Sequence, residues 1–134
     1  MSNSAYALIG LASWAIIQTF ILLTVRLVAM RDGRAMNSFD PQGKDLAGFG
    51  QRATRAHINT LENLAILASF LLFGIATDQT AITEGLACWV LYARIAQSVT
   101  HMISISVPMV LLRATLFTVQ LVICVIWAWD FWHA

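Results

Sequence analysis

The chain has 134 residues, of which 59% are hydrophobic and only 11% are charged, and its mean hydropathy is +0.73. A soluble domain carries about 25% charged residues, so this composition cannot cover a water-exposed surface. The net charge of +1 and the pI of about 7.9 also argue against binding to nucleic acid. The composition therefore indicates an integral membrane protein and argues against a soluble enzyme or a disordered chain.

Four segments are long enough to cross a bilayer as helices, which requires about 20 largely apolar residues each. The predicted helices cover residues 5–30, 47–77, 83–105 and 108–132. The first lacks the positive charges that precede a cleavable signal, so we expect it to be retained as a helix. The second reaches spanning length only by including a polar first half, and Pro108 is a favourable first-turn residue for the fourth.

The connections between the later segments are short, which forces neighbouring helices to run antiparallel. We therefore expect one all-α domain over residues 1–134, an integral membrane up-down four-helix bundle. Six of the eight Lys and Arg residues lie between Arg26 and Arg55, around the one long connection. The positive-inside rule places that connection in the cytoplasm and both termini on the opposite side. There, Trp127, Trp129 and Trp132 fit an interfacial aromatic belt.

Polar residues follow helical spacing in the second and third segments. Arg52, Arg55, Asn59 and Glu62 are three, four and three residues apart, which aligns them on one helix face. Arg94, Gln97, Ser98 and His101 form a second stripe of the same kind. Ionisable groups at membrane depth mark either a functional site or a paired structural site.

The balance of charge favours a ligand for these stripes. One helical carboxylate, Glu62, faces five arginines: Arg26, Arg52, Arg55, Arg94 and Arg113. The structural alternative is that polar residues hold the helices together and that Arg26 extends towards the lipid headgroups. Several cations without protein counter-ions instead predict an external anion, and a small zwitterion with net negative charge fits the set.

Motifs of soluble enzymes do not compete with this interpretation. The chain has no nucleophile elbow, no HExxH and no phosphate-binding glycine loop. His57, His101 and His133 are scattered without the spacing of metal ligands, so no metal site is expected.

One stretch resembles a known family signature. QRATRAHINTLENL, residues 51–64, is similar to the second-helix signature of the membrane-associated proteins in eicosanoid and glutathione metabolism (MAPEG). Supporting features are TVRL at residues 24–27, YAR at 92–94 and the turn from Pro108 to Arg113. The resemblance covers nearly the whole chain, and we expect a bacterial-type member.

The resemblance implies a homotrimer that binds glutathione, as a co-substrate, between adjacent subunits near the cytoplasmic side. Matched residues imply that Arg26, Arg55, Asn59 and Glu62 hold glutathione, with Arg52 and His57 where relatives sometimes add contacts. Arg94 occupies the family position in the third helix. Arg113 is the first candidate for stabilising the catalytic thiolate and Arg94 is the second.

Two departures from the family pattern keep two functions open. Gln97 and His101 stand where relatives often have His or Tyr, and Ala114 follows Arg113 where some relatives have Ser. His101 could donate a hydrogen bond to the ligand or serve in polar packing. The leading hypothesis is a glutathione transferase or peroxidase that acts on hydrophobic small molecules dissolved in the bilayer. The alternative is a non-catalytic protein that binds lipids or other small molecules.

Overall fold

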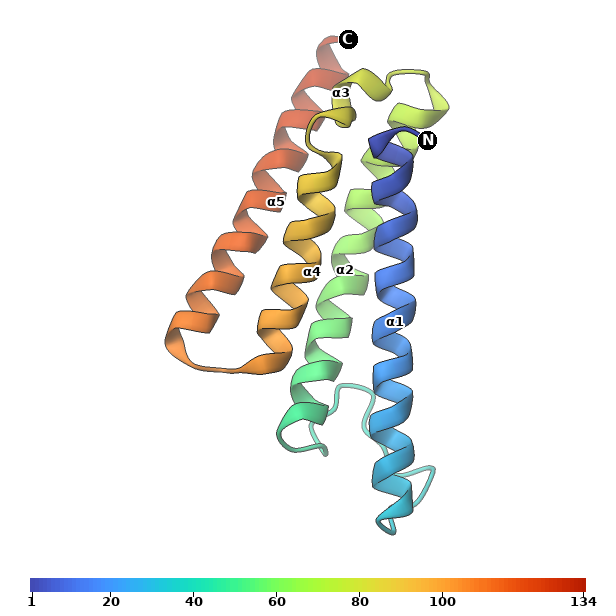
Figure 1. Cartoon of the computed structure of the whole chain (residues 1–134), viewed down its shortest axis with the longest axis vertical. Helices are drawn as coiled ribbons and strands as arrows, with labels where there is room; N and C mark the ends of the chain where they lie inside the picture. Colours follow the sequence, from blue (N-terminus) through green and yellow to red (C-terminus); the bar gives the residue numbers. More distant parts are fainter.

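The computed structural model describes all 134 residues, of which 79% are helical and none lies in a strand. The predicted all-α class is therefore confirmed. The helices are α1 (Asn3–Arg31), α2 (Phe49–Ala76), α3 (Thr80–Glu84), α4 (Ala87–Ile103) and α5 (Val107–His133). The four long helices lie side by side, with both termini at one end and the long loop at the other (Figure 1).

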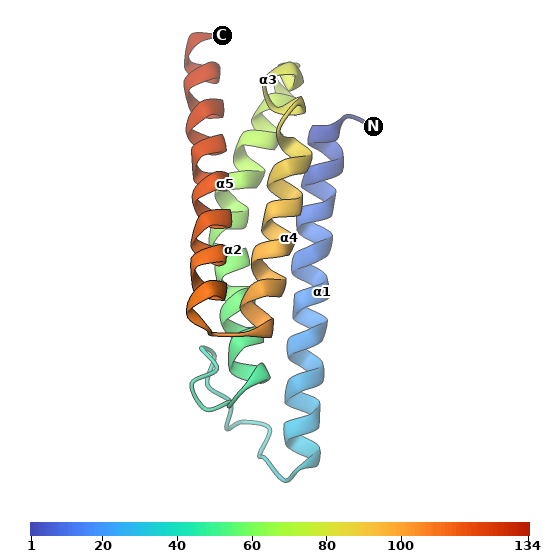
Figure 2. The ribbon, with the colours of Figure 1, turned by 60° about the vertical axis from the view of Figure 1, so that its left-hand side comes forward.

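The helices are arranged around α2 and α4, with α1 on one side and α5 on the other (Figure 2). α1 packs against both central helices, whereas α5 packs mainly along α4. At its first turns α5 leans away from α2, so the two helices diverge towards the loop end (Figure 1).

Three helices, α1, α2 and α5, are long and apolar enough to cross a membrane. Their outward faces carry large apolar side chains such as Ile16, Phe20 and Val125, as expected of helices that contact lipid. α4 has 17 residues, fewer than the about 20 that a spanning helix requires, and it contains Arg94.

The predicted continuous helix over residues 83–105 is divided in two. α3 ends at Glu84, and α4 begins only at Ala87. The Glu84 carboxylate lies at the start of α1, where it accepts hydrogen bonds from the backbone N–H groups of Asn3 at 2.6 Å and Ser4 at 3.2 Å. The first amides of a helix have no acceptor within the helix, so this carboxylate satisfies them from a distant part of the chain.

Replacing Glu84 with glutamine is expected to remove an acid-sensitive part of the stability. The hydrogen bond from the Asn3 amide, followed by those from Ser4, holds the pKa of Glu84 below its ordinary value of 4.5. Its stabilising effect is thus complete above pH 4.5 and is lost as the pH falls through the lowered pKa. Thermal unfolding measured from neutral pH downwards should show the wild type losing more stability in that window than Glu84→Gln. Parallel pH profiles would contradict the assignment.

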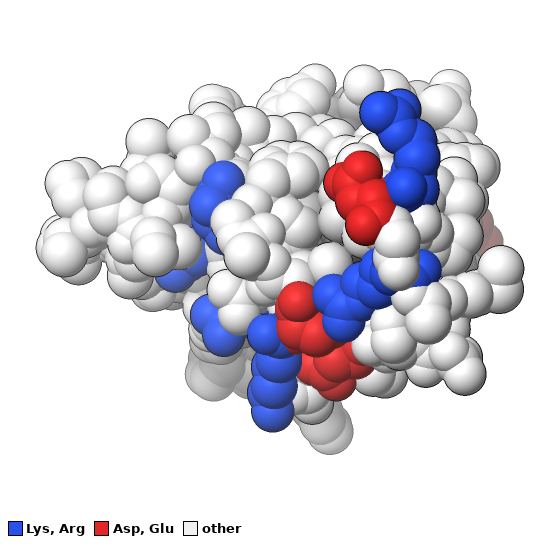
Figure 3. Space-filling model, turned by 90° about the horizontal axis from the view of Figure 1, so that it is seen from below, with Lys and Arg blue, Asp and Glu red and all other residues white.

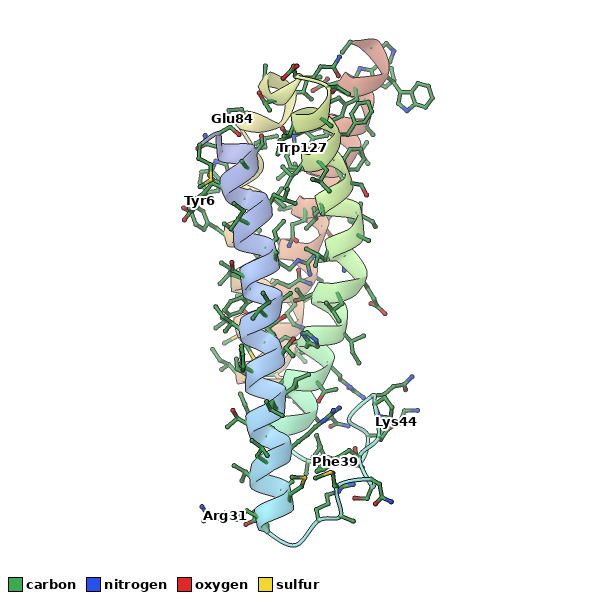
Figure 4. The ribbon with its side chains drawn as sticks, turned by 90° about the vertical axis from the view of Figure 1, so that its right-hand side faces the viewer. Tyr6, Arg31, Phe39, Lys44, Glu84 and Trp127 are labelled. Atoms are coloured by element: carbon green, nitrogen blue, oxygen red, sulfur yellow. The ribbon has the colours of Figure 1, made fainter.

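The apolar core lies in the half of the molecule nearest the termini. Leu11, Leu71 and Val90 pack there around Trp127, which is fully buried and meets Phe70 with ring centroids 6.3 Å apart. Figure 4 shows Trp127 at the same end as Glu84.

The expectation that all three C-terminal tryptophans form an interfacial belt is wrong for Trp127. Trp127 lies one helix turn before Phe131, and both rings pack inwards against Phe70 of α2. Trp129 and Trp132 do face outwards, with exposed fractions of 66% and 86%. Only Trp127 is therefore buried in the core, because residues 127, 129 and 132 do not share a single helix face.

The long loop between α1 and α2 is packed rather than extended. Arg34 forms an ion pair with Asp45 and lies 4.9 Å from the ring centroid of Phe39. Gly43 has φ +70°, and a Cβ there would lie 2.8 Å from the Cβ of Thr54 on α2, so only glycine permits this approach. The loop is thereby held against α2, which places Lys44 beside that helix (Figure 4).

Candidate functional site

Two neighbouring polar pockets lie in the half of the molecule nearest the loop, one between the loop, α2 and α4 and the other between α2, α4 and α5, and we call them together the polar groove. Its basic half has a volume of about 370 Å³ and is lined by Gln42, Lys44, Arg55, Ile58, Asn59, Glu62 and His101. Its second half, which we call the Arg113 half, has about 250 Å³ and is lined by Asn59, Gln97, His101, Val110, Arg113, Ala114 and Phe117. Asn59 and His101 line both halves and therefore mark their junction.

Helical spacing and loop packing together build this groove. Arg55, Asn59 and Glu62 are four and three residues apart on α2, so their side chains emerge from one face of the helix. His101 comes from the last turn of α4, and Arg113 from the second turn of α5, after the turn that Pro108 helps to begin. The packed loop adds Lys44.

The groove contains more positive than negative charge. Lys44 and Arg55 share the basic half with one carboxylate, that of Glu62, and Arg113 lines the other half. None of these four groups forms an ion pair, since the single ion pair of the protein is Arg34–Asp45 in the loop. Lys and Arg also gather at this end of the molecule (Figure 3). The arrangement can therefore accept an anion and still provide one carboxylate for a positive group.

A network of side-chain hydrogen bonds lies beneath the groove. Arg94 is only 1% exposed, and its Nη1 donates to Asn59 Oδ1 at 2.9 Å. Gln97 Nε2 donates to the same oxygen at 3.1 Å, and Gln120 Nε2 donates to Gln97 Oε1 at 3.0 Å. The network thus links Gln120 of α5, through Gln97 of α4, to Asn59 of α2, the residue that lies at the junction of the two halves.

The structure brings together five of the eight residues predicted for the site: Arg55, Asn59, Glu62, His101 and Arg113. Arg94 contacts the groove only through Asn59. Arg52 donates from Nε to the carbonyl oxygen of Met102 at 2.8 Å, which ties α2 to the end of α4. Arg26 lies near the loop, 5.8 Å from the ring centroid of Phe39, and lines no part of the groove within its own chain.

His57, a position where relatives sometimes add contacts, also lies outside the groove. It is half-buried, and its Nδ1 is buried without a hydrogen-bond partner. Its place two residues after Arg55 turns it to another face of α2. No cluster of three or more His, Cys, Asp or Glu side chains could hold a metal ion.

Sequence reasoning missed two contributors to the site. Lys44 reaches the groove only because the loop folds back on α2, and no pattern in the sequence indicates that packing. Gln120 could have been found, because it is the single amide side chain in α5 and lies in an apolar stretch of that helix. A polar residue at membrane depth is a signal of function or pairing wherever it occurs.

Comparison with known proteins identifies a family for this sequence. The family model described as MAPEG family matches residues 4–131, nearly the entire chain. Searches of curated proteins and of solved structures find no match.

Proposed function

The chain belongs to the MAPEG family of membrane proteins, and we propose that it binds glutathione in the polar groove and activates its thiol towards hydrophobic electrophiles. The family includes glutathione transferases and peroxidases as well as non-catalytic members. The observation that carries the proposal is the unpaired charge of the groove, where Lys44, Arg55 and Arg113 face the single carboxylate of Glu62.

Glutathione fits this charge pattern. At neutral pH it carries two carboxylates and one ammonium group, hence a net negative charge. In our proposal Arg55 and Lys44 bind carboxylate, because a guanidinium matches two carboxylate oxygens with parallel hydrogen bonds. Glu62 binds the ammonium group from the same side of α2. His101, at the junction, lies within the groove as a further polar contact.

Activation of the thiol is assigned to Arg113. The thiolate is the nucleophile, and a thiol is mostly protonated at neutral pH, so a fixed positive charge beside the sulfur raises the reactive fraction. An arginine supplies that charge without losing its own proton. Val110, Ala114 and Phe117 surround Arg113 with apolar groups suited to a lipid-soluble substrate. The sulfur then forms a bond to the electrophilic carbon, the leaving group departs with its electron pair, and the thiol proton passes to solvent.

Arg94 is assigned a supporting role. It is buried beneath Asn59, so a ligand in the groove meets Asn59 first. Its charge has no carboxylate partner, and it therefore adds positive potential beneath the groove. This favours Arg113 over Arg94 as the group that contacts sulfur.

We further propose a homotrimeric assembly of four-span subunits with α4 as the third crossing, the long loop in the cytoplasm and both termini on the opposite side. The lysines and arginines gathered at the loop end support this orientation (Figure 3). Arg26 lies outside the groove of its own chain, which fits a site that a neighbouring subunit completes. Detergent-corrected mass measurement tests the assembly, and a stable monomer would contradict it.

Calorimetry of the purified protein with glutathione tests the proposed ligand. We expect saturable binding that weakens as salt is added, because exposed charges are screened. S-methylglutathione should also bind, since it retains both carboxylates and the ammonium group. Absence of saturable binding would exclude glutathione as the ligand and with it the proposed function.

A non-catalytic binding protein is the second candidate function. The observation that favours it is Ala114, which places no hydroxyl next to Arg113 in the groove. An assay of glutathione conjugation to a generic aryl halide separates the two functions. Binding together with conjugation supports the transferase, whereas binding without conjugation or peroxidase activity supports the non-catalytic candidate.

A further inference from the structure

The hydrogen-bond network beneath the groove has a defined direction. A guanidinium can only donate, so the atom of Asn59 that Arg94 contacts at 2.9 Å must be the oxygen. That oxygen also accepts from Gln97 at 3.1 Å. The Asn59 amide is thereby turned with Oδ1 towards α4, and its Nδ2 has no partner within the chain and remains accessible.

The orientation of the amide of Gln120, at the other end of the network, follows from the same reasoning. Gln120 Nε2 donates both to Gln97 Oε1 at 3.0 Å and to the carbonyl oxygen of Leu116 at 2.9 Å. A carbonyl oxygen can only accept, so Gln120 must present its nitrogen to Leu116. Gln97 must then present its oxygen to Gln120 and its nitrogen to Asn59. Both ends of the network consequently impose the same orientation on Asn59.

We propose that Gln97 and Gln120 are positioning residues, which hold the Asn59 amide with its N–H groups towards the groove. This inference rests on the proposed function and adds that Asn59 donates to an acceptor in the central, cysteinyl residue of glutathione. The location follows from the groove itself. Asn59 lines both the basic half, where the terminal carboxylates and ammonium bind, and the Arg113 half, where the sulfur lies.

Stability and binding should respond differently when Gln120 is changed. Gln120 is 1% exposed and its Oε1 is buried without a partner, so its amide is not fully satisfied. Leucine of similar size would remove this unsatisfied oxygen but would also leave Gln97 Oε1 without the N–H that it accepts, so the two effects on stability oppose each other. A residue kept only for structure would lower stability when replaced, whereas a positioning residue would lower binding.

The test compares Gln120→Leu with Gln18→Leu. Gln18 on α1 is also 1% exposed, neither of its amide atoms has a hydrogen-bond partner, and it does not line the groove. Gln120→Leu should bind glutathione about three- to tenfold more weakly than the wild type, with little change in Tm, because Gln97 loses the hydrogen bond that orients its amide towards Asn59. Gln18→Leu should bind as the wild type does.

Asn59→Asp provides a second variant. Aspartate keeps an acceptor for Arg94 and Gln97, so the fold should be retained, but it replaces the free N–H groups with a second acceptor oxygen. We expect it to lose glutathione binding at concentrations that saturate the wild type. Wild-type affinity in Asn59→Asp would overturn the inference, even if Gln120→Leu failed to fold.

The outcomes separate this inference from the proposed function. If the wild type binds glutathione and Gln120→Leu binds equally well, or no more weakly than Gln18→Leu, the inference fails and the proposed function stands. If the wild type does not bind glutathione, the proposed function fails, and nuclear magnetic resonance decides the positioning. The Asn59 side-chain amide signals, identified by their loss in Asn59→Asp, should shift in Gln120→Leu and not in Gln18→Leu; signals that do not shift overturn the inference.

Discussion

Replacing Arg113 with alanine is expected to lower the kcat of glutathione conjugation by about 100-fold, the usual order for removing one group that stabilises developing or fixed negative charge. The affinity for glutathione should change far less, because the carboxylates and the ammonium group bind in the basic half of the groove. The loss arises from a higher pKa of the bound thiol, where each pKa unit corresponds to a tenfold smaller thiolate fraction at a pH below that pKa. The measurement is a pH profile of kcat with an aryl halide, which should shift to higher pH in the variant.

Arg31→Ala is the matched control for this charge change. Arg31 is exposed at the end of α1 and lines no part of the groove, so kcat and its pH profile should remain those of the wild type. An Arg113→Ala variant with wild-type kcat and pH profile would show that another group stabilises the thiolate. Arg94 is the next candidate, acting through Asn59.

The second large effect is expected at Arg55. Arg55→Ala should weaken glutathione binding by about 10- to 100-fold, since a hydrogen bond to a charged group contributes about 1.5–3 kcal/mol. Arg55 is exposed in the basic half of the groove and forms no ion pair, so its removal leaves no buried partner unsatisfied. Stability should therefore change little. Calorimetry gives the affinity, and thermal unfolding gives the stability.

Arg55→Lys distinguishes charge from geometry. Lysine preserves the positive charge but cannot form two parallel hydrogen bonds to one carboxylate, so an affinity between those of the wild type and Arg55→Ala is expected. An Arg55→Ala variant that unfolds readily would instead assign the side chain to structure. Undiminished affinity in Arg55→Ala would exclude it from the binding site.

The motif at residues 51–64, together with the supporting features in the other helices, predicted the family correctly, and the match over residues 4–131 confirms it. Composition predicted the membrane environment, which the three long apolar helices and the family support. These features are local, because runs of apolar residues and spacings of three and four can be read along one helix. The same spacing correctly placed Arg55, Asn59 and Glu62 on a single face of α2.

The break at residues 85 and 86 could not be predicted in this way. The segment from residue 83 to 105 is apolar enough to read as one helix, whereas the contact made by the residue before the break lies on α1. There the backbone N–H groups of Asn3 and Ser4 donate to the carboxylate of Glu84, which is 80 or more residues away along the chain. The burial of Trp127 could not be predicted locally either, since it depends on the position of Phe70 on α2.

The sequence by itself determined the membrane environment, the helical class, the family and the excess of arginine over carboxylate. Each of these depends on composition or on spacing within one helix. Only the tertiary structure decided which of those charges share a groove. It separated Arg113, which lines the groove, from Arg94, which is buried beneath it, and it added Lys44 and Gln120. The physical reason is that helical periodicity gives the direction of a side chain around its own axis, whereas the neighbour that it meets depends on the packing of separate helices and of the loop between them.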